Sequence, residues 1–523
     1  MKLIYMLILT FLFCQIPERR VVAEWENSIG TMIRWPLGIP MDLVSELAED
    51  DKLFVLVENL NQQNLAINSF NSYQVNISNV EFVISESYSH WTRDYGPQFI
   101  IGQDYWKVIN QQFNGYPEEN GCNENIASNT NNYLNGRIVN GEARGWEEDD
   151  DSNIDFANHM NWDIKDLNLY FTGGNFMTDG YGTGFSTQLM ANENEISNDQ
   201  FQQIVRDELY LSDYHFFENP NELSIQHIDC LAKLVNSETV IIKQVPQSSP
   251  EYDCIESFAQ AFSDLNTFYG RPFKIFRIYC PVINGGVWEV NPVAAYTNSL
   301  ILNSKVLVPQ YGSINSINDE NALNIYREAM PGYEVIGFYN NTGSPWYSED
   351  ALHCRTIGIF NPNMLHISHK SIRSEEIINN NQIYIEAEVI DYSNSNNNIE
   401  SVFLNWKYES EESFNEIQLE LVTNNIFSGY LPVINTNSTI NYYISSINNE
   451  GNYVTSPNTG FYVFNSLEIS LGDVNNDEFI NIQDVILVIN LVLNESYDAA
   501  ADLNLDNEIN VLDIIELVNL ILN

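Results

Sequence analysis

The chain has 523 residues, and 44% of them are hydrophobic, which is enough for about two to four domains with packed cores. It carries 71 acidic and 22 basic residues, a formal net charge of −49 at pH 7. A polyanion of this kind repels nucleic acid and anionic lipid, so we expect neither as a partner, whereas cationic ligands are attracted. An acidic surface that serves solubility in a salty or calcium-rich exterior explains the same charge equally well.

A short apolar run from Leu3 to Phe13 opens the chain. It is typical of a secretory signal peptide, which we expect over residues 1–20, and it is too short for a membrane span of about 20 apolar residues. Cys14 stands where a lipoprotein cysteine would, but the bulky Phe13 before it matches a lipobox poorly. We therefore expect a secreted bacterial protein, extracellular or associated with the cell surface, without a membrane span.

Five cysteines remain once Cys14 is set aside, and an odd number in a secreted protein indicates one reactive thiol. If Cys354 is that thiol, the other four form two disulfides or remain small buried residues. These four are Cys122, Cys230, Cys254 and Cys280.

Residues 21–370 alternate short strand patterns with helical ones, which favours a mixed α/β domain. The expected strands include 53–57, 80–84, 240–242 and 300–302, and the expected helices include 199–211 and 318–330. The region from Glu118 to Asn153 is rich in Asn, Glu and Asp, as is typical of a long surface insertion.

Three short motifs in this region carry the groups needed to break a C–N bond of a guanidinium ion. They are Asp94 in the segment WTRDYGP, His227 and Asp229 in QHID, and Cys354 in HCRT. Because a guanidinium stays protonated near neutral pH, carboxylates must hold the cation while a strong nucleophile attacks its central carbon. A thiolate is the strongest such nucleophile in proteins, and a histidine supplies and withdraws protons.

With these motifs the chain resembles the agmatine deiminase and Porphyromonas-type peptidylarginine deiminase family, over residues 24–364. The matching segments are EWE at 24–26, MIRWP at 32–36, WTRDYGP at 91–97, TGGNFMTDG at 172–180, QHID at 226–229, AYTNS at 295–299 and HCRT at 353–356. The resemblance implies a five-bladed, pseudo-symmetric α/β propeller with the active site on its central axis. It implies no metal or organic cofactor for catalysis.

The resemblance also implies a role for each residue. Asp94 and Asp229 clamp the guanidinium nitrogens, and Cys354 attacks the carbon to give a covalent amidino-thioether. His227 protonates the departing ammonia and then activates water. The remaining expected site residues orient the substrate or line the pocket, and they are Asn298, Trp91, Gly173, Gly174, Asn175 and Asp179. We interpret His353 and Arg355 as supports.

Two substrates fit this resemblance. Thr172, where agmatine deiminases tend to carry Glu, and the HCRT segment are closer to the peptidylarginine branch. That branch holds a terminal carboxylate with arginines, and this chain has none between Arg93 and Arg137, so internal arginines or a small amine fit better. We expect peptidylarginine to be converted to peptidylcitrulline and ammonia. An extracellular agmatine deiminase that gives N-carbamoylputrescine and ammonia is the first alternative, and a non-catalytic, scaffold-attached binding protein is the second.

Residues 371–466 alternate apolar and polar positions between turns rich in Asn, Ser and Gly. This pattern favours a β-sandwich, and the spacing of its turns is typical of an immunoglobulin-like module. The expected strands include 383–389, 402–408, 417–421 and 440–444. The module has no catalytic signature, so we interpret it as a spacer or a stabilising partner.

Residues 467–523 contain a repeat, in which a loop beginning at Asp473 returns 29 positions later at Asp502. Each copy offers oxygen ligands at loop positions 1, 3, 5, 9 and 12 and a carbonyl at position 7, as in an EF-hand loop that binds Ca²⁺. The expected ligands are Asp473, Asn475, Asp477, Phe479, Asn481 and Asp484, then Asp502, Asn504, Asp506, Glu508, Asn510 and Asp513. An apolar helix is predicted after each loop, over residues 485–493 and 514–522.

This tail resembles a type I dockerin, which implies calcium in a small all-α domain and a cohesin-like partner. Loop position 6, usually Gly, is Glu478 in the first copy and Asn507 in the second. Because a positive φ suits Asn better than Glu, we expect weaker calcium binding in the first loop. The pairs at 482–483 and 511–512 are less polar than usual, which favours an atypical cohesin or a tail packed on the sandwich. A metal-free acidic hairpin is the alternative.

Overall fold

The structure is a computed structural model of the whole chain. It describes residues 15–116, 137–139, 142–144, 146–219, 225–283, 292–312, 315–374, 377, 382–393, 398–432, 434, 437–466, 471–475, 479–494, 496–498, 500–504 and 508–522. The chain forms two compact units, Met1–Met364 with Asp391–Asn397, and Leu365–Ile390 with Asn398–Asn523. Within the described residues, every helix is too short or too polar to cross a lipid bilayer.

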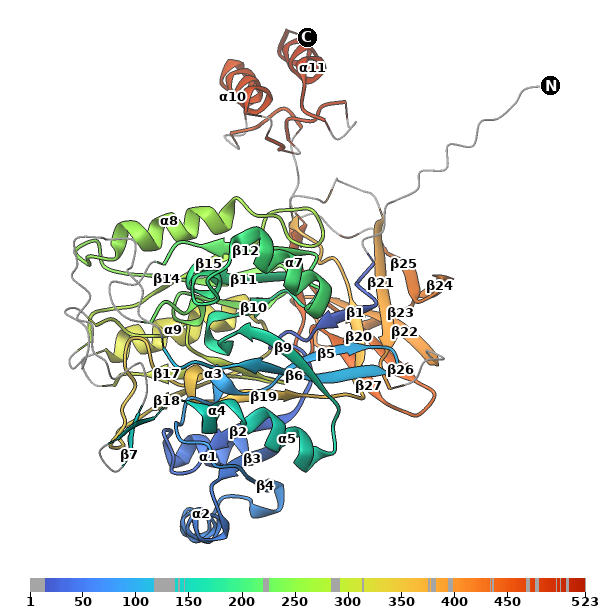
Figure 1. Cartoon of the computed structure of the whole chain (residues 1–523). Coiled ribbons are helices and arrows are strands. Elements are labelled where there is room, and N and C mark those ends of the chain that lie inside the picture. Colours follow the sequence, from blue (N-terminus) through green and yellow to red (C-terminus); the bar gives the residue numbers. More distant parts are fainter. Residues whose placement is uncertain are drawn as a thin grey trace. The chain divides into compact units, whose positions relative to one another are not determined.

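Small sheets with one recurring pairing pattern build the first unit, since in each an antiparallel pair is followed by a parallel pair (Figure 1). One four-stranded sheet has β19 (Ile357–Phe360), β2 (Ser28–Arg34), β3 (Lys52–Val57) and β4 (Val80–Ile84), and another has β1 (Arg19–Val21), β5 (Gln98–Gly102), β6 (Tyr105–Gln112) and β9 (Ile164–Tyr170). A three-stranded sheet has β10 (Met177–Thr178), β11 (Thr183–Thr187) and β12 (Asp213–Phe217), and the next has β13 (Ala232–Asn236), β14 (Thr239–Gln244) and β15 (Lys274–Tyr279). A further three-stranded sheet has β16 (Leu300–Leu302), β17 (Lys305–Gln310) and β18 (Glu334–Tyr339). The short strands β7 (Arg137–Val139) and β8 (Glu142–Arg144) pair with each other.

Helices supply the crossovers that parallel strands need, and α2 and α8 lie at opposite outer edges of the unit with sheets between them (Figure 1). The helices are α1 (Met41–Leu47), α2 (Leu60–Ser72), α4 (Glu147–Asp150), α5 (Ser152–Met160), α6 (Leu189–Asn192), α7 (Asn198–Leu209), α8 (Tyr252–Ser263) and α9 (Ser316–Ala329), with a 3-10 turn η1 (Ile77–Asn79) before β4. In α7, Phe201, Val205 and Leu209 bury one face at helical spacing, and Ser197 and Gln200 form a capping box at its start.

Short helical turns link the last strand of one sheet to the first strand of the next. They are α3 (Thr92–Tyr95) after β4, η2 (Gly173–Asn175) after β9, η3 (Ile228–Cys230) after β12 and η4 (His353–Arg355) after β18. The turn α3 packs against η2 and η4, and η2 packs against η3. Equivalent connections from different sheets therefore meet at one place, although they are far apart in the sequence.

The sequence predictions of local structure in this unit are mostly confirmed. The mixed α/β class is confirmed, β4 and β16 coincide with the predicted strands, and α7 and α9 lie within two residues of the predicted helices. The surface insertion predicted for 118–153 is wrong at its C-terminal end, because Trp146, Asp149 and Asn153 are buried. The Asp149 carboxylate accepts the backbone N–H groups of Tyr88 and Ser89 at 2.5 and 3.0 Å, so this acidic residue caps a core loop instead of facing solvent.

A buried ion pair fixes the N-terminal strand β1. Arg20 is fully buried, and its two terminal nitrogens donate to the two oxygens of Glu26, each at 2.7 Å. Its third nitrogen, Nε, donates to the hydroxyl of Tyr392 at 2.9 Å. The folded unit thus includes residues at the end of the expected signal peptide, 1–20, of which residues 1–14 lie outside the described part.

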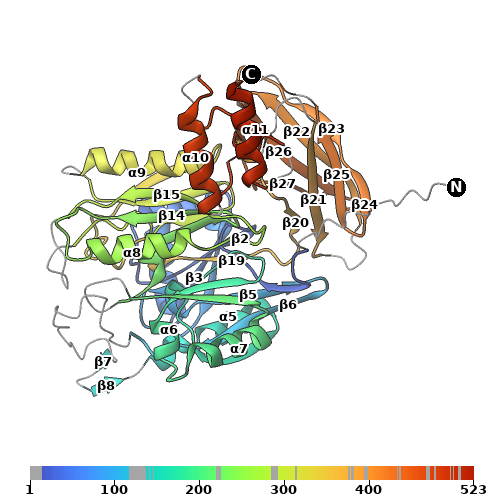
Figure 2. The same cartoon turned by 90° about the horizontal axis from the view of Figure 1, so that it is seen from above.

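The second unit contains a β-sandwich (Figure 2). One sheet has β20 (Leu365–Ser368), β21 (Ile383–Asp391), β25 (Ile426–Leu431) and β24 (Glu420–Thr423), and the other has β23 (Asn415–Gln418), β22 (Ile399–Tyr408), β26 (Ser438–Asn448), β27 (Tyr453–Ser456) and β28 (Tyr462–Ser466). Ile385, Val402 and Ile440 from the two sheets share one core. The single strand predicted at 417–421 is wrong, because the chain turns inward at buried Leu419 and passes from one sheet to the other.

The two predicted tail helices are present as α10 (Ile482–Leu493) and α11 (Val511–Leu522), which pack on each other through Val485, Val488 and Leu517. Each begins three residues earlier than predicted. At α10 the reason is a capping box, in which Asn481 and Asp484 bond each other's backbone N–H groups. The prediction of a separate all-α domain is wrong, because these helices belong to a compact unit that is mostly β.

Replacing Arg20 by Ala removes the cation that neutralises buried Glu26. We expect the free energy of unfolding of the first unit to fall by about 3–5 kcal/mol, because an unpaired buried charge remains. The matched control is R19A, since the exposed Arg19 side chain stacks on Tyr105 at the surface. Urea titrations followed by tryptophan fluorescence measure both variants, and equal losses would contradict the assignment.

Candidate active site

The packed turns bring the predicted chemical groups together. Asp94 comes from α3, Asp229 from η3 with His227 just before it, and Cys354 from η4, and all four are at most 3% exposed. The Nδ1 atom of His227 lies 3.6 Å from Oδ1 of Asp94, and the sulfur of Cys354 lies 3.7 Å from Oδ2 of Asp229. Groups separated by up to 260 positions in the sequence therefore converge on one buried point.

Gly174 marks the centre of this cluster. A Cβ atom on it would lie 2.4 Å from Oδ1 of Asp94, 2.9 Å from Nδ1 of His227 and 3.3 Å from Oδ2 of Asp229. Its backbone N–H donates to Asp94 at 3.2 Å. The close approach of three polar groups excludes any side chain here, and this is the physical reason for glycine at the position.

Asn298 joins the carboxylate to the thiol. Its side-chain N–H₂ donates to Oδ2 of Asp229 and to the sulfur of Cys354, each at 3.2 Å. Its carbonyl oxygen accepts the backbone N–H groups of His353 and Cys354 at 3.0 and 3.3 Å. Every polar atom of this amide is therefore used to fix the turn η4 relative to Asp229.

The two carboxylates differ electrostatically. Burial, followed by the charge of Asp229, raises the pKa of Asp94 well above its usual value. Burial also acts to raise the pKa of Asp229, but the hydrogen bond and the charge of His353 outweigh it and leave that pKa lowered. Of the two carboxylates, Asp94 therefore holds a proton more tightly and Asp229 ionises more readily.

Burial sets the state of His227 and of the thiol as well. Burial lowers the pKa of His227 to about 4, although the charge of Asp229 opposes the shift, so the imidazole is neutral near pH 7. A hydrogen bond from Cys230 lowers the pKa of Cys354, but burial and the charge of Asp229 raise it further, to about 11. Cys354 is therefore protonated near pH 7, and a cation beside it favours the thiolate.

Aromatic rings form a wall beside the carboxylates. Tyr116 donates its hydroxyl to Oδ2 of Asp94 at 2.7 Å, and its ring lies 5.2 Å from that of Trp91 and 5.6 Å from that of Trp146. The sequence predicts Trp91 here but not Tyr116 or Trp146. No motif marks these two residues, which flank the acidic insertion.

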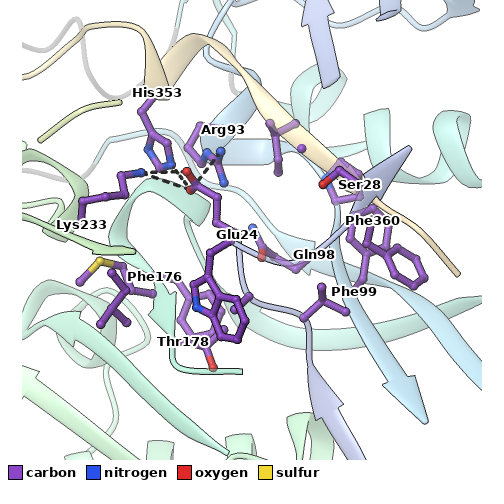
Figure 3. Close-up of a pocket in the computed structure, with 18 residues that line it drawn as sticks. Glu24, Ser28, Arg93, Gln98, Phe99, Phe176, Thr178, Lys233, His353 and Phe360 are labelled. Atoms are coloured by element: carbon purple, nitrogen blue, oxygen red, sulfur yellow. Dashed lines mark hydrogen bonds and ion pairs between the residues drawn. The ribbon is translucent and has the colours of Figure 1, made fainter. Parts of the chain in front are cut away.

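Glu24 lies on the other side of His353, and Figure 3 shows its carboxylate facing three basic side chains. It bonds Nε2 of His353 at 2.5 Å, Nζ of Lys233 at 3.0 Å and an Nη atom of Arg93 at 3.4 Å. Nδ1 of the same imidazole bonds Oδ2 of Asp229 at 2.7 Å. Glu24, Arg93, Lys233 and His353 line a cavity of about 60 Å³. Sequence reasoning found Glu24 only as part of a matching segment.

Two of the residues expected to line the pocket lie outside the cluster. The carbonyl oxygen of Asn175 accepts N–H groups of Thr187 and Ile228 at 3.0 and 3.2 Å, so it braces the turn that precedes Asp229. Asp179 closes a tight turn by accepting the N–H groups of Tyr181 and Thr183 at 2.8 and 2.9 Å. Gly173 is packed against the backbone of Arg93.

The cysteine prediction needs correction. Cys254 is disulfide-bonded, but Cys230 and Cys280 are free and buried, so the four candidates do not all pair with one another. Cys122 lies outside the described residues. Cys230 follows Asp229 directly and contacts the site.

The tail loops bury carboxylates in a stretch of sequence that contains no basic residue. Asp473, Asp484, Asp502 and Asp513 are buried, and the chain has no Lys, Arg or His after Lys407. Asp484 accepts the N–H groups of Val474, Asn475 and Asn481 at 2.8–3.1 Å, and Asp513 closes the second loop in the same way with Leu503, Asn504 and Asn510. Phe479 and Glu508, whose backbone carbonyl oxygens are the expected ligands at loop position 7, are exposed. Asp477 and Asp506 lie outside the described residues, and within those residues no three His, Cys, Asp or Glu side chains gather around one metal position.

Two parts of the chain match known protein families. Residues 20–358 match the model of the Porphyromonas-type peptidyl-arginine deiminase family, and residues 471–522 match the type I dockerin domain. A candidate agmatine deiminase of Enterococcus faecalis is 26% identical over 298 residues, which cover 51% of this chain and 73% of that protein. A similar protein of Lactococcus lactis is 25% identical over 300 residues, with the same coverage.

Solved structures share the fold. The agmatine deiminase of Enterococcus faecalis has a TM-score of 0.53 at 21% identity, over 66% of this chain and 97% of that one. A candidate arginine deiminase of Porphyromonas gingivalis has a TM-score of 0.51 at 18% identity, over 65% and 98%. Because the family model matches well over half of the residues, the chain belongs to the Porphyromonas-type peptidyl-arginine deiminase family and carries a type I dockerin domain at its C-terminus.

Proposed function

We propose that the protein is a secreted hydrolase that converts peptidylarginine to peptidylcitrulline and ammonia through a covalent intermediate on Cys354. The observation that supports this most directly is the convergence of four groups, since Asp94, His227 and Asp229 approach Gly174 and the thiol of Cys354 approaches Asp229. A planar cation that lies against the backbone of Gly174 meets the carboxylate of Asp94 from α3 and that of Asp229 from η3. Any side chain at position 174 would occupy the place of this cation.

Binding and activation are coupled in this proposal. The guanidinium pairs with Asp229, which is already ionised, and its charge favours loss of the proton from Asp94. The same charge stabilises the thiolate of Cys354, whose proton passes to neutral His227. Trp91 and Tyr116 cover the substrate from the aromatic side.

The chemistry then takes two displacements. The thiolate attacks the guanidinium carbon, His227 returns its proton to one nitrogen, and ammonia leaves an amidino-thioether on Cys354. His227 next removes a proton from water, whose oxygen attacks the same carbon. The C–S bond breaks, and the proton on the added oxygen passes to solvent, where it converts the departed ammonia to ammonium. His227 returns the other water proton to the sulfur of Cys354, and the ureido product leaves the enzyme in its starting state. Through its two hydrogen bonds, Asn298 keeps the sulfur of Cys354 beside Asp229 during both displacements.

The arrangement of sheets supports a five-bladed propeller. Each sheet repeats the same pairing, and each connection to the next sheet carries a site residue or a neighbour of one. The last strand of the unit, β19, pairs with β2 near its beginning, which closes the series. Closure of this kind leaves the connections facing a common axis.

Agmatine is the alternative substrate, favoured by the similarity to agmatine deiminases. The cations described near the site are already paired, since Arg93 and Lys233 face Glu24, and Arg355 bonds Asp350 at 2.7 Å. These three do not hold a substrate carboxylate, which fits an internal arginine or an amine. The side chains of Arg137 and Arg144 lie outside the described residues.

A substrate panel with an ammonia readout tests the proposal. We expect turnover of internal peptidylarginine, and loss of at least about 10⁴-fold of the rate in C354A, because the nucleophile is removed. C280S is the matched control and keeps the activity. Turnover of agmatine alone would reject the peptidyl substrate, and binding without ammonia release in the unmutated protein would favour the non-catalytic alternative.

The pH dependence follows from the raised pKa of Asp94 in the free enzyme. Asp94 must lose its proton to solvent, whereas the proton of Cys354 stays in the site on His227, so kcat/KM falls as pH decreases through the raised pKa of Asp94. In the substrate complex the cation lowers this pKa, so the acidic limb of kcat lies at lower pH. Initial rates from pH 5 to 10 measure the two limbs, and coincident limbs would contradict the coupling.

We propose that the tail attaches the enzyme to a cohesin-like partner outside the cell and that its loops hold Ca²⁺. Buried carboxylates at positions 1 and 12 of each loop, in a segment without basic residues, fit a hard divalent cation. The sandwich, of proposed immunoglobulin-like type, separates the tail from the catalytic residues in the sequence. An apolar leader ahead of residue 15 fits export.

Calcium titration of the chelated full chain tests the loops. We expect two binding events, with the second loop tighter because Asn507 accepts a positive φ more readily than Glu478. D502N removes the tight event, and D473N removes the weak one. Isothermal titration calorimetry measures both, and magnesium serves as the control ion. Identical heats from the unmutated chain and D502N would contradict the assignment.

A further inference from the structure

A second thiol lies against the nucleophile. The sulfur atoms of Cys230 and Cys354 each lie 3.7 Å from the backbone carbonyl oxygen of Glu349. They also bracket one carboxylate, since Cys230 lies 3.5 Å from Oδ1 of Asp229 and Cys354 lies 3.7 Å from Oδ2. Two shared acceptors hold the sulfurs side by side, and the Cys230 thiol donates a hydrogen bond to the Cys354 sulfur.

Neither step of the proposed reaction uses Cys230. It is fully buried and free, and it occupies the position directly after Asp229. Thiols that react reversibly with oxidants lie beside a second cysteine that resolves the first product. The other described free cysteine, Cys280, bonds the carbonyl oxygen of Ile278 at 3.6 Å and lacks such a neighbour among the described sulfurs.

We propose that Cys230 and Cys354 form an oxidative modification site, at which a small cationic disulfide links the two sulfurs and reversibly blocks the enzyme. The thiolate of Cys354 attacks the disulfide RSSR, giving a mixed disulfide and releasing one RS⁻. The thiol of Cys230, as its thiolate, then attacks the sulfur of Cys354, so that the Cys230–Cys354 bond forms and the second RS⁻ leaves. The two cysteines lose two electrons and two protons, and RSSR gains them as two RSH.

The charge of the site selects the oxidant. Asp94, Asp229 and the nearby Glu349 and Asp350 face the two sulfurs, whereas the described basic groups nearby are paired with Glu24 or Asp350. A slim dication therefore concentrates at the pocket, and an anionic disulfide is repelled. A small cationic disulfide can approach Cys354 by the same route as a guanidinium side chain.

Peptide mapping of the full-length protein tests this site. The protein is treated at pH 8.5 with cystamine, a dicationic disulfide, or with anionic oxidised glutathione, then alkylated and digested without reductant. We expect a peptide linked through Cys230 and Cys354, formed about tenfold or more faster with cystamine. Ammonia release is lost in parallel and returns after dithiothreitol.

Two variants make the result decisive. C230S cannot form the link, so cystamine leaves a stable mixed disulfide on Cys354, whereas C280S forms the link as the unmutated chain does. Cystamine-treated protein in which Cys230 is still alkylated as a free thiol would overturn the proposal. Because the link is detected by mass, this outcome is distinguishable from a failure of the deiminase assignment, which concerns turnover alone.

Discussion

The carboxylate of Glu24 holds together the segments on which the site is built. Its oxygens contact the side chains of Arg93, Lys233 and His353 and the backbone N–H of Ile301. Each partner lies within four residues of a site residue, namely Asp94, Asp229, Cys354 and Asn298. The Glu24 side chain is 18% exposed, but its partners Arg93, Lys233 and His353 are buried, and each would be left without this countercharge if Glu24 moved. One acidic side chain therefore fixes four separate turns relative to one another.

The same interaction makes two chemically identical carboxylates different. His353 bonds both Glu24 and Asp229, and its hydrogen bond and charge lower the pKa of Asp229. Among the described residues, Asp94 accepts hydrogen bonds from the hydroxyl of Tyr116 and the N–H of Gly174 and lies 3.6 Å from Nδ1 of His227, and burial raises its pKa. Opposite pKa shifts in neighbouring groups are the pattern by which sites divide the tasks of binding and proton transfer.

The protein buries acidic groups in two places. In the first unit, Asp94 and Asp229 both approach Gly174. In the tail, Asp473, Asp484, Asp502 and Asp513 are buried where the sequence has no basic residue at all. The proposed ligands, a guanidinium in the first place and Ca²⁺ in the second, would each compensate this acidic charge.

The sequence determined which residue types are available at the candidate site and most of the local structure. Motifs picked out Asp94, His227, Asp229 and Cys354, which the fold brings together, and periodicity located most strands and helices within a few residues. Both succeed because residue type and short-range pattern carry this information. The tertiary structure decided which groups meet: that Gly174 lies between three polar atoms, that Tyr116 bonds Asp94, that acidic Asp149 is buried, and that Cys230 touches the nucleophile. These contacts join residues on different sheets, and no spacing along the chain encodes how packed turns approach one another in space.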